Sequence, residues 1–64
     1  MTQEQQNKID SIIERQQPDN TVILDDIDGV GILGQPSGWV LLELQWDSGR
    51  VYQYGISPEG RSHT

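Results

Sequence analysis

The segment Trp39–Ile56, with the sequence WVLLELQWDSGRVYQYGI, constrains the fold of this chain more than any other. It holds both tryptophans and both tyrosines of a chain that has no phenylalanine. Asp47-Ser48-Gly49 in its middle fits a three-residue hairpin connection, in which a type I turn is followed by glycine in the left-handed region. The pattern therefore predicts one long antiparallel β-hairpin that carries every Trp and Tyr side chain of the protein.

The predicted turn also sets the register of the hairpin. Trp46 is expected to lie opposite Arg50, and side chains alternate between the two faces from there. The first face, which we expect to form the core, holds Val40, Leu42, Leu44, Trp46, Arg50, Tyr52, Tyr54 and Ile56. The second face is mixed and holds Trp39, Leu41, Glu43, Gln45, Val51 and Gln53. The apolar residues of this face, Trp39, Leu41 and Val51, lie either under the N-terminal helix or at the surface. Trp39 is equally compatible with a core and an interface position.

Residues 1–17 are predicted to form a helix. Thr2 and Gln5 match the capping box, in which each side chain satisfies a backbone N–H group of the other residue. The apolar positions follow the i, i+3, i+4 spacing of one helix face and are Ile9, Ile12 and Ile13. Pro18 ends the helix, because the residue before a proline avoids helical dihedral angles. Since the apolar stripe is narrow, we expect this helix to pack against a sheet or a second subunit.

Two shorter strands are predicted between the helix and the hairpin. Residues 21–24 are apolar and mostly β-branched, and residues 30–33 form a second apolar run after an acidic, glycine-containing turn. Together with the hairpin they make a four-stranded antiparallel meander over residues 21–57, and residues 58–64 are expected to be a tail. The chain is thus predicted to be a single small α+β domain over residues 1–64.

The hairpin region resembles two known families. Residues 29–60 are similar to the last strands of the SH3-like barrel of mind-bomb-type and HECT-type ubiquitin ligases. The residues that carry this resemblance are Leu44, Trp46, Asp47, Gly49, Tyr54 and Gly55, preceded by Gly29-Val30-Gly31-Ile32. Residues 44–59 also resemble the hairpin of the bacterial KTSC domain through Trp46, Gly49, Val51, Tyr52 and Tyr54. The resemblance implies a strongly curved, SH3-like sheet that is used for binding rather than catalysis.

The chain has few residues suited to catalysis. It contains no cysteine, and its one histidine is His63, so no nucleophile is expected beside a base. The acidic turn at residues 25–29 does not fit a calcium-binding EF-hand loop, because Leu24 and Gln35 would occupy the first and last ligand positions. The glycine pattern of residues 29–34 lacks the βαβ unit of a dinucleotide site. We therefore expect no enzyme, no metal and no cofactor.

Charge and size restrict the partners. The net charge is −6 with only four basic residues, so direct nucleic-acid binding is not expected, whereas attraction to basic protein surfaces is. No apolar run approaches the ~18 residues of a membrane span, and no signal peptide is predicted, so we expect a cytoplasmic protein. A chain of this length buries only about 60% of its unfolded surface. A homodimer or obligate complex is therefore as well supported as a monomer.

These observations favour a small acidic protein-binding module that binds a protein partner or a second copy of itself. The predicted partner-binding residues are Trp39, Leu41, Val51, Ile9, Ile12 and Ile13. The first alternative is a phage-type inhibitor of a host defence or nucleic-acid-handling protein, whose phosphate-mimicking acids would be Asp25, Asp26, Asp28, Glu43 and Asp47. The second is a small-ligand binder, such as a nucleotide binder, with its site between subunits, because a monomer this small has little room for a pocket of ~300 Å³.

Overall fold

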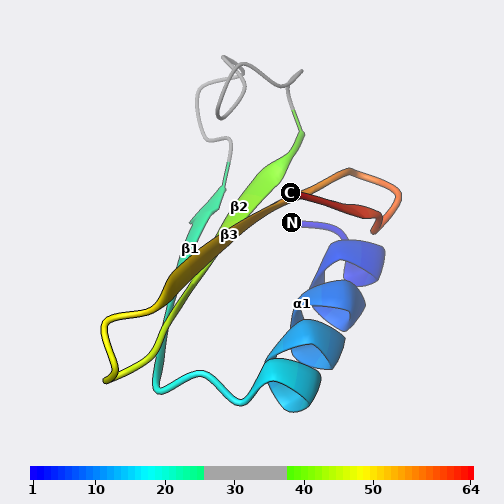
Figure 1. Cartoon of the computed structure of the whole chain (residues 1–64). Coiled ribbons are helices and arrows are strands. Elements are labelled where there is room, and N and C mark those ends of the chain that lie inside the picture. The colour runs from blue at the N-terminus through cyan, green and yellow to red at the C-terminus, as the bar shows by residue number, and fades with distance from the viewer. Residues whose placement is uncertain (26–37) are drawn as a thin grey trace.

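The computed structural model (Figure 1) describes residues 1–25 and 38–64. Within these residues the chain has an α+β fold, with one helix and an antiparallel sheet of four strands in the order β1-β2-β3-β4. The elements are α1 (Gln3–Gln16), β1 (Asn20–Asp25), β2 (Val40–Gln45), β3 (Val51–Ile56) and β4 (Ser62–His63). The α+β prediction is confirmed, and β1 confirms the strand predicted over residues 21–24. The strand predicted over residues 30–33 lies outside the described residues.

α1 begins and ends at the expected signals. Thr2 Oγ1 accepts a hydrogen bond from the backbone N–H of Gln5, and Gln5 Oε1 accepts one from the backbone N–H of Thr2, so the capping box is complete. At the other end Gln17 is left-handed, with a φ of 52°, and its backbone N–H donates to the carbonyl oxygen of Ile13. This bond is the usual αL helix cap, and Pro18 then prevents the helix from continuing.

The long hairpin has the predicted register. Its pairs include Val40 with Ile56, Leu42 with Tyr54 and Leu44 with Tyr52. In the turn, the backbone N–H of Gly49 donates to the carbonyl oxygen of Trp46, and the N–H of Trp46 donates to the carbonyl oxygen of Arg50. The φ of Gly49 is 96°, a conformation that glycine adopts without steric cost. The glycine at position 49 therefore determines where the ribbon reverses.

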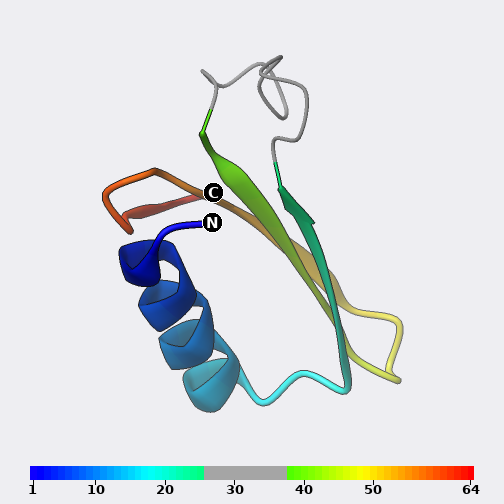
Figure 2. The same ribbon diagram turned by 180° about the vertical axis from the view of Figure 1, so that it is seen from behind.

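α1 covers one face of the sheet, as Figures 1 and 2 show from opposite sides. It packs on β2 and β3. The core residues are fully buried or nearly so and are Ile9, Ile12, Val40, Leu42, Leu44 and Ile56, with Ile13, Trp46 and Tyr54 partly buried against them. The first hairpin face is thus the core face, as predicted. Arg50 and Tyr52 are exceptions, since both are exposed. Tyr52 is exposed because β4 pairs only with the last two residues of β3 and leaves the rest of that strand at the sheet edge.

The C-terminal residues form a strand, which corrects the predicted tail over residues 58–64. β4 pairs antiparallel with the end of β3, with Gly55 opposite His63 and Ile56 opposite Ser62. A two-residue strand has no alternating pattern that could reveal it in the sequence. The fourth strand of the described sheet is therefore β4, which the sequence did not predict.

The loop between β3 and β4 contacts the first turn of α1. The backbone N–H of Gly60 donates to the carbonyl oxygen of Ser57, and Gly60 has a φ of 84°. A β-carbon at this position would lie 2.8 Å from the carbonyl oxygen of Glu4. Thr2 Oγ1 donates a hydrogen bond to the carbonyl oxygen of Pro58 over 3.1 Å. The loop thereby fixes the N-terminal end of α1 against the sheet.

The sheet formed by the described strands is open and is not strongly curled (Figures 1 and 2). The predicted strong curvature is therefore wrong for this part of the chain. α1 has 14 residues, and no helix within residues 1–25 and 38–64 is long and apolar enough to cross a membrane.

Candidate protein-binding surface

The sheet has a second face, opposite α1, which we call the open face. Because side chains alternate along a strand, the buried positions of β2 and the pairing register assign every described strand residue to one face or the other. The open face consists of Asn20, Val22, Leu24, Trp39, Leu41, Glu43, Gln45, Val51, Gln53, Gly55 and His63. Within the described part of the chain no helix or strand lies over this face (Figures 1 and 2).

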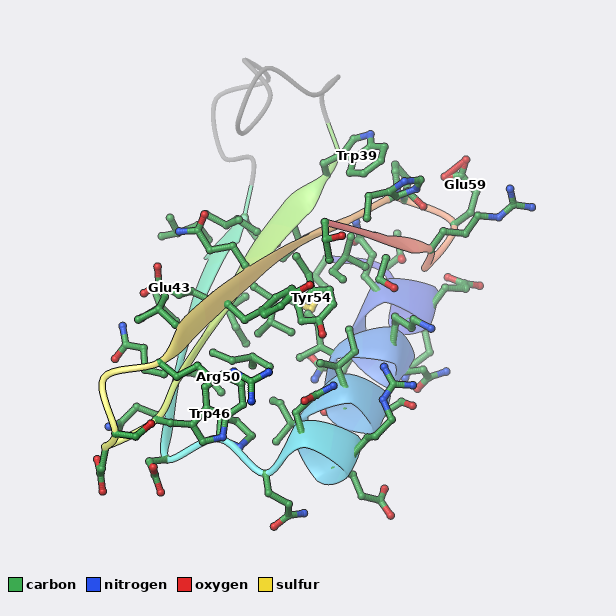
Figure 3. All side chains as sticks on the ribbon, in the orientation of Figure 1. Trp39, Glu43, Trp46, Arg50, Tyr54 and Glu59 are labelled. Carbon is green, nitrogen blue, oxygen red and sulfur yellow. The ribbon has the colours of Figure 1, made fainter. Side chains whose placement is uncertain are left out.

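Trp39 lies at the end of the open face where β2 begins, and Figure 3 shows it there, away from α1. Its ring packs over Gly55, because a β-carbon at Gly55 would be 3.4 Å from Trp39 Cε3. The ring of His63 is 5.0 Å from that of Trp39, centroid to centroid, at an angle of 52°. Trp39 is half-buried. Its position is intermediate between the core and the interface alternatives that the sequence left open.

Leu41 and Leu24 continue the apolar surface beside Trp39. Leu41 pairs with Gly55 on one side and with Leu24 on the other. Leu41 is buried, whereas Leu24 on the edge strand is exposed. Sequence reasoning placed Leu24 in a strand but not on this face, because the register between β1 and β2 cannot be derived across the long connection that separates them.

Glu43 occupies the middle of the open face and is held by two amide side chains. Gln53 Nε2 donates to Glu43 Oε1 over 2.8 Å, and Gln45 Nε2 donates to Glu43 Oε2 over 2.6 Å. The hydrogen bond from Gln53, followed by that from Gln45, lowers the pKa of the Glu43 carboxyl below its ordinary value, because both bonds favour the charged form. The open face therefore carries a fixed negative charge at its centre.

Val51 lies at the other end of the open face, beside the hairpin turn. It pairs with Gln45 and is exposed. Because Val51 lies opposite Gln45, its distance from Leu41 along the sheet is about the distance from Leu41 to Gln45. These two residues are four positions apart on β2, which corresponds to roughly 13 Å at ~3.3 Å per residue. The polar group of Glu43, Gln45 and Gln53 separates the two apolar ends, so the patch predicted as Trp39, Leu41 and Val51 is not continuous.

The helix stripe is not part of the candidate surface. Ile9 and Ile12 are fully buried under β2 and β3, and Ile13 packs against the same core. The structure therefore corrects the prediction that Ile9 and Ile12 are available to a partner. The burial has a simple cause, since the face of the hairpin that α1 covers is the more apolar of the two.

Trp46 connects the hairpin turn to the end of α1. Its indole Nε1–H donates to the carbonyl oxygen of Gln17 over 3.1 Å. The guanidinium carbon of Arg50 lies 4.7 Å from the centre of the Trp46 ring, within the range of a cation–π contact, as the labelled side chains in Figure 3 illustrate. These contacts agree with the structural role expected for Trp46.

The acidic residues do not form one cluster. Asp26 and Asp28 lie outside the described residues. Asp25 Oδ1 is 3.9 Å from the N-terminal amino nitrogen of Met1, whereas Asp47 belongs to the hairpin turn. Asp25 lies beside Val40, with which it pairs. Asp47 is seven residues from Val40, which corresponds to roughly 23 Å along an extended strand, so Asp25 and Asp47 are far apart. Among the described residues no three histidine, aspartate or glutamate side chains gather in a way that could hold a metal ion.

Comparison of the chain with protein-family models, with curated proteins and with solved structures found no significant match.

Proposed function

We propose that the protein is a non-catalytic protein-binding module that recognises its partner through the open face. One observation carries this proposal: α1 covers only one of the two sheet faces, and the other presents an aromatic ring and exposed aliphatic side chains. Exposed apolar groups rimmed by polar ones are typical of interaction surfaces, and tryptophan is enriched at the residues that dominate binding energy.

The proposed surface has three parts that suit recognition of a polypeptide. Trp39 and Leu24 supply apolar area at one end, Val51 supplies it at the other, and the ionised Glu43 lies between them. An anchored carboxylate favours a partner that brings a cation or N–H donors to this point. The net charge of −6 favours a basic partner surface in the same way.

The resemblance to SH3-like ligase domains agrees with a binding role, and an SH3-like arrangement of the complete chain remains part of this proposal. A cytoplasmic location belongs to it as well, since a chain without cysteine is compatible with a reducing compartment.

Two neighbouring residues provide a matched test. Val51 is 54% exposed on the open face, and Tyr52 is 40% exposed on the opposite face. The immobilised wild type, V51E and Y52E are each used to capture partners from an extract of the source cells. We expect Val51→Glu to abolish capture of the wild-type partner and Tyr52→Glu to preserve it, with circular dichroism confirming that both variants are folded. Equal capture by V51E and the wild type would contradict the proposal.

The acidic inhibitor is the alternative that the net charge supports. It requires a row of carboxylates that faces a basic groove, whereas Asp25, Glu43 and Asp47 lie at separate places and Glu43 is engaged by two amides. Exposed charges are screened within about 10 Å at 0.1 M salt. A complex made by the acidic surface alone should therefore weaken steeply as salt rises, whereas one made mainly through Trp39 and Val51 should weaken only slightly, by the share of its attraction that comes from charge.

A further inference from the structure

Strand β1 forms an exposed apolar edge of the sheet. All six of its residues are exposed, including Val22 and Ile23 at 40% and Leu24 at 51%. Within the described residues β1 pairs with β2 alone, and α1 packs on β2 and β3. Ile23 lies on the α1 side of the sheet, and its neighbours Val22 and Leu24 lie on the open face. The backbone groups of β1 that point away from β2 are thus available to another strand.

β1 lacks the features that prevent edge pairing in other proteins. Exposed edges are usually made very short or interrupted by lysine, proline or an inward-pointing charge. β1 is six residues long, its sequence NTVILD contains no lysine, arginine or proline, and its only charge is Asp25 at the end. Three consecutive β-branched residues, Thr21, Val22 and Ile23, add strand propensity. At the other side of the sheet, the edge strand β4 has only two residues, and the part of β3 that it leaves unpaired begins directly after the charged Arg50.

We propose that β1 is a self-association edge, at which two copies of the chain pair their β1 strands in antiparallel fashion about a twofold axis at Ile23. The two sheets then join into one continuous sheet, to which each copy contributes its four described strands. Both α1 helices lie on one side of this sheet and both open faces on the other. This inference rests on the edge of β1 and does not require partner binding by the open face, although Leu24 belongs to both.

The register follows from symmetry and charge. A twofold axis perpendicular to the sheet keeps each side chain on its own face, so a β1 residue must lie opposite one of the same parity. Centring the pair on Val22 would place Asp19 opposite Asp25 of the second copy at both ends, and directly opposed like charges are destabilising. Centring it on Ile23 avoids this repulsion.

The Ile23-centred register is also complementary along the strand. It pairs Ile23 with Ile23 of the second copy and Val22 with Leu24, so apolar residues meet apolar residues on both faces. Thr21 then lies opposite Asp25, whose carboxylate can accept a hydrogen bond from the threonine hydroxyl. Because each copy carries a net charge of −6, added salt should strengthen this association, which is the opposite of its effect on binding to a basic partner.

A charge-swap experiment tests the edge directly. Sedimentation of the full chain over a range of concentrations should show a monomer–dimer equilibrium. Ile23→Lys places two ammonium groups opposite each other and should raise the dissociation constant at least about tenfold, equivalent to 1.4 kcal/mol. An equimolar mixture of I23K and I23E should restore a mixed dimer. Tyr52→Lys, on the α1 side of β3 and 40% exposed like Ile23, is the matched control and should dimerise like the wild type.

Disulfide trapping tests the register, since the chain has no cysteine of its own. In I23C the two sulfurs belong to directly opposed residues, whose Cα atoms lie about 4.5–5.5 Å apart, within disulfide range. In V22C the two residues are displaced by two positions and lie about 8 Å apart, which is too far to bridge. Mild oxidation should therefore crosslink I23C and not V22C.

Three results would each overturn the inference, provided that circular dichroism and tryptophan emission show folded variants. They are a wild type that stays monomeric at every concentration, a dimer that survives Ile23→Lys, and V22C crosslinking in preference to I23C. None of these results bears on capture of a partner by the open face, which Val51→Glu tests separately.

Discussion

At the scale of single residues, two glycines with positive φ have different surroundings. Gly49 in the hairpin turn has a φ of 96°, and among the described residues no heavy atom beyond its chain neighbours lies within 4 Å of the place where a β-carbon would be. Gly60 has a φ of 84°, and a β-carbon there would lie 2.8 Å from the carbonyl oxygen of Glu4. The first glycine serves the backbone conformation alone, whereas the second also allows the β3–β4 loop to approach α1.

We therefore expect Gly60→Ala to lower the free energy of unfolding more than Gly49→Ala. The left-handed conformation costs a non-glycine residue roughly 1–2 kcal/mol, which should account for the Gly49→Ala effect. Gly60→Ala adds a steric clash with backbone and should exceed about 2 kcal/mol. Urea unfolding of the two variants measures both values. Equal losses would show that the loop does not pack on α1 as described.

Glu43 predicts a pH dependence of known sign. Its pKa in the folded protein is lowered by the hydrogen bonds from Gln53 and Gln45. A lowered folded pKa contributes stability above the unfolded pKa, and this contribution is lost as the pH falls through the folded value. NMR titration of the Glu43 carboxyl carbon should give a midpoint below the ordinary value of 4.5. In E43Q the part of the acid-induced loss of stability that comes from Glu43 should be absent. A Glu43 midpoint at or above 4.5 would show that the two amide hydrogen bonds do not stabilise the charged carboxylate.

At the scale of elements, the attachment of α1 to the sheet depends on Gln5. This side chain is buried, and its Nε2 donates to the carbonyl oxygens of Gly38 over 2.7 Å and Ile56 over 3.3 Å. Its Oε1 completes the capping box with Thr2. The sequence pattern revealed the cap, but the link to the sheet depends on how the helix docks, which local patterns do not encode.

We expect Gln5→Ala to lower the free energy of unfolding by at least about 1 kcal/mol, because it removes a helix-cap bond and a donor to a buried carbonyl. Gln3→Ala is the matched control. Gln3 is exposed, and its side chain donates to Asn7 one turn further along α1, so its loss should stay within about 0.5 kcal/mol. Thermal unfolding followed by circular dichroism compares them. A Gln5→Ala effect as small as that of Gln3→Ala would mean that the helix is held by its apolar stripe alone.

The hairpin and α1 were predictable because their signals are local. A turn with Gly49 sets the pairing of residues on either side, and a capping box with Pro18 delimits a helix. The register of β1 on β2 depends on a connection of fourteen residues, 26–39, and β4 is too short to carry a pattern. The candidate surface was partly predictable for the same reason. The turn placed Trp39, Leu41 and Val51 on one face. The division of this surface by Glu43 and its extension onto β1 depend on contacts between residues that are distant in the sequence.

At the scale of the whole molecule, the single described helix gives the two faces of the sheet different roles. It covers the more apolar hairpin face and forms the core, and it leaves the mixed face without a cover among the described residues. The two faces of the sheet therefore differ in their access to solvent.

Paramagnetic solvent relaxation in NMR tests this difference most directly. A soluble gadolinium chelate is added to the dilute protein, and methyl signals are compared between the faces. We expect strong broadening at Val51 on the open face, and retained signals at Leu42 and Ile56 beneath α1. Protection of Val51 to the same degree as Leu42, or broadening of Ile56, would contradict the account.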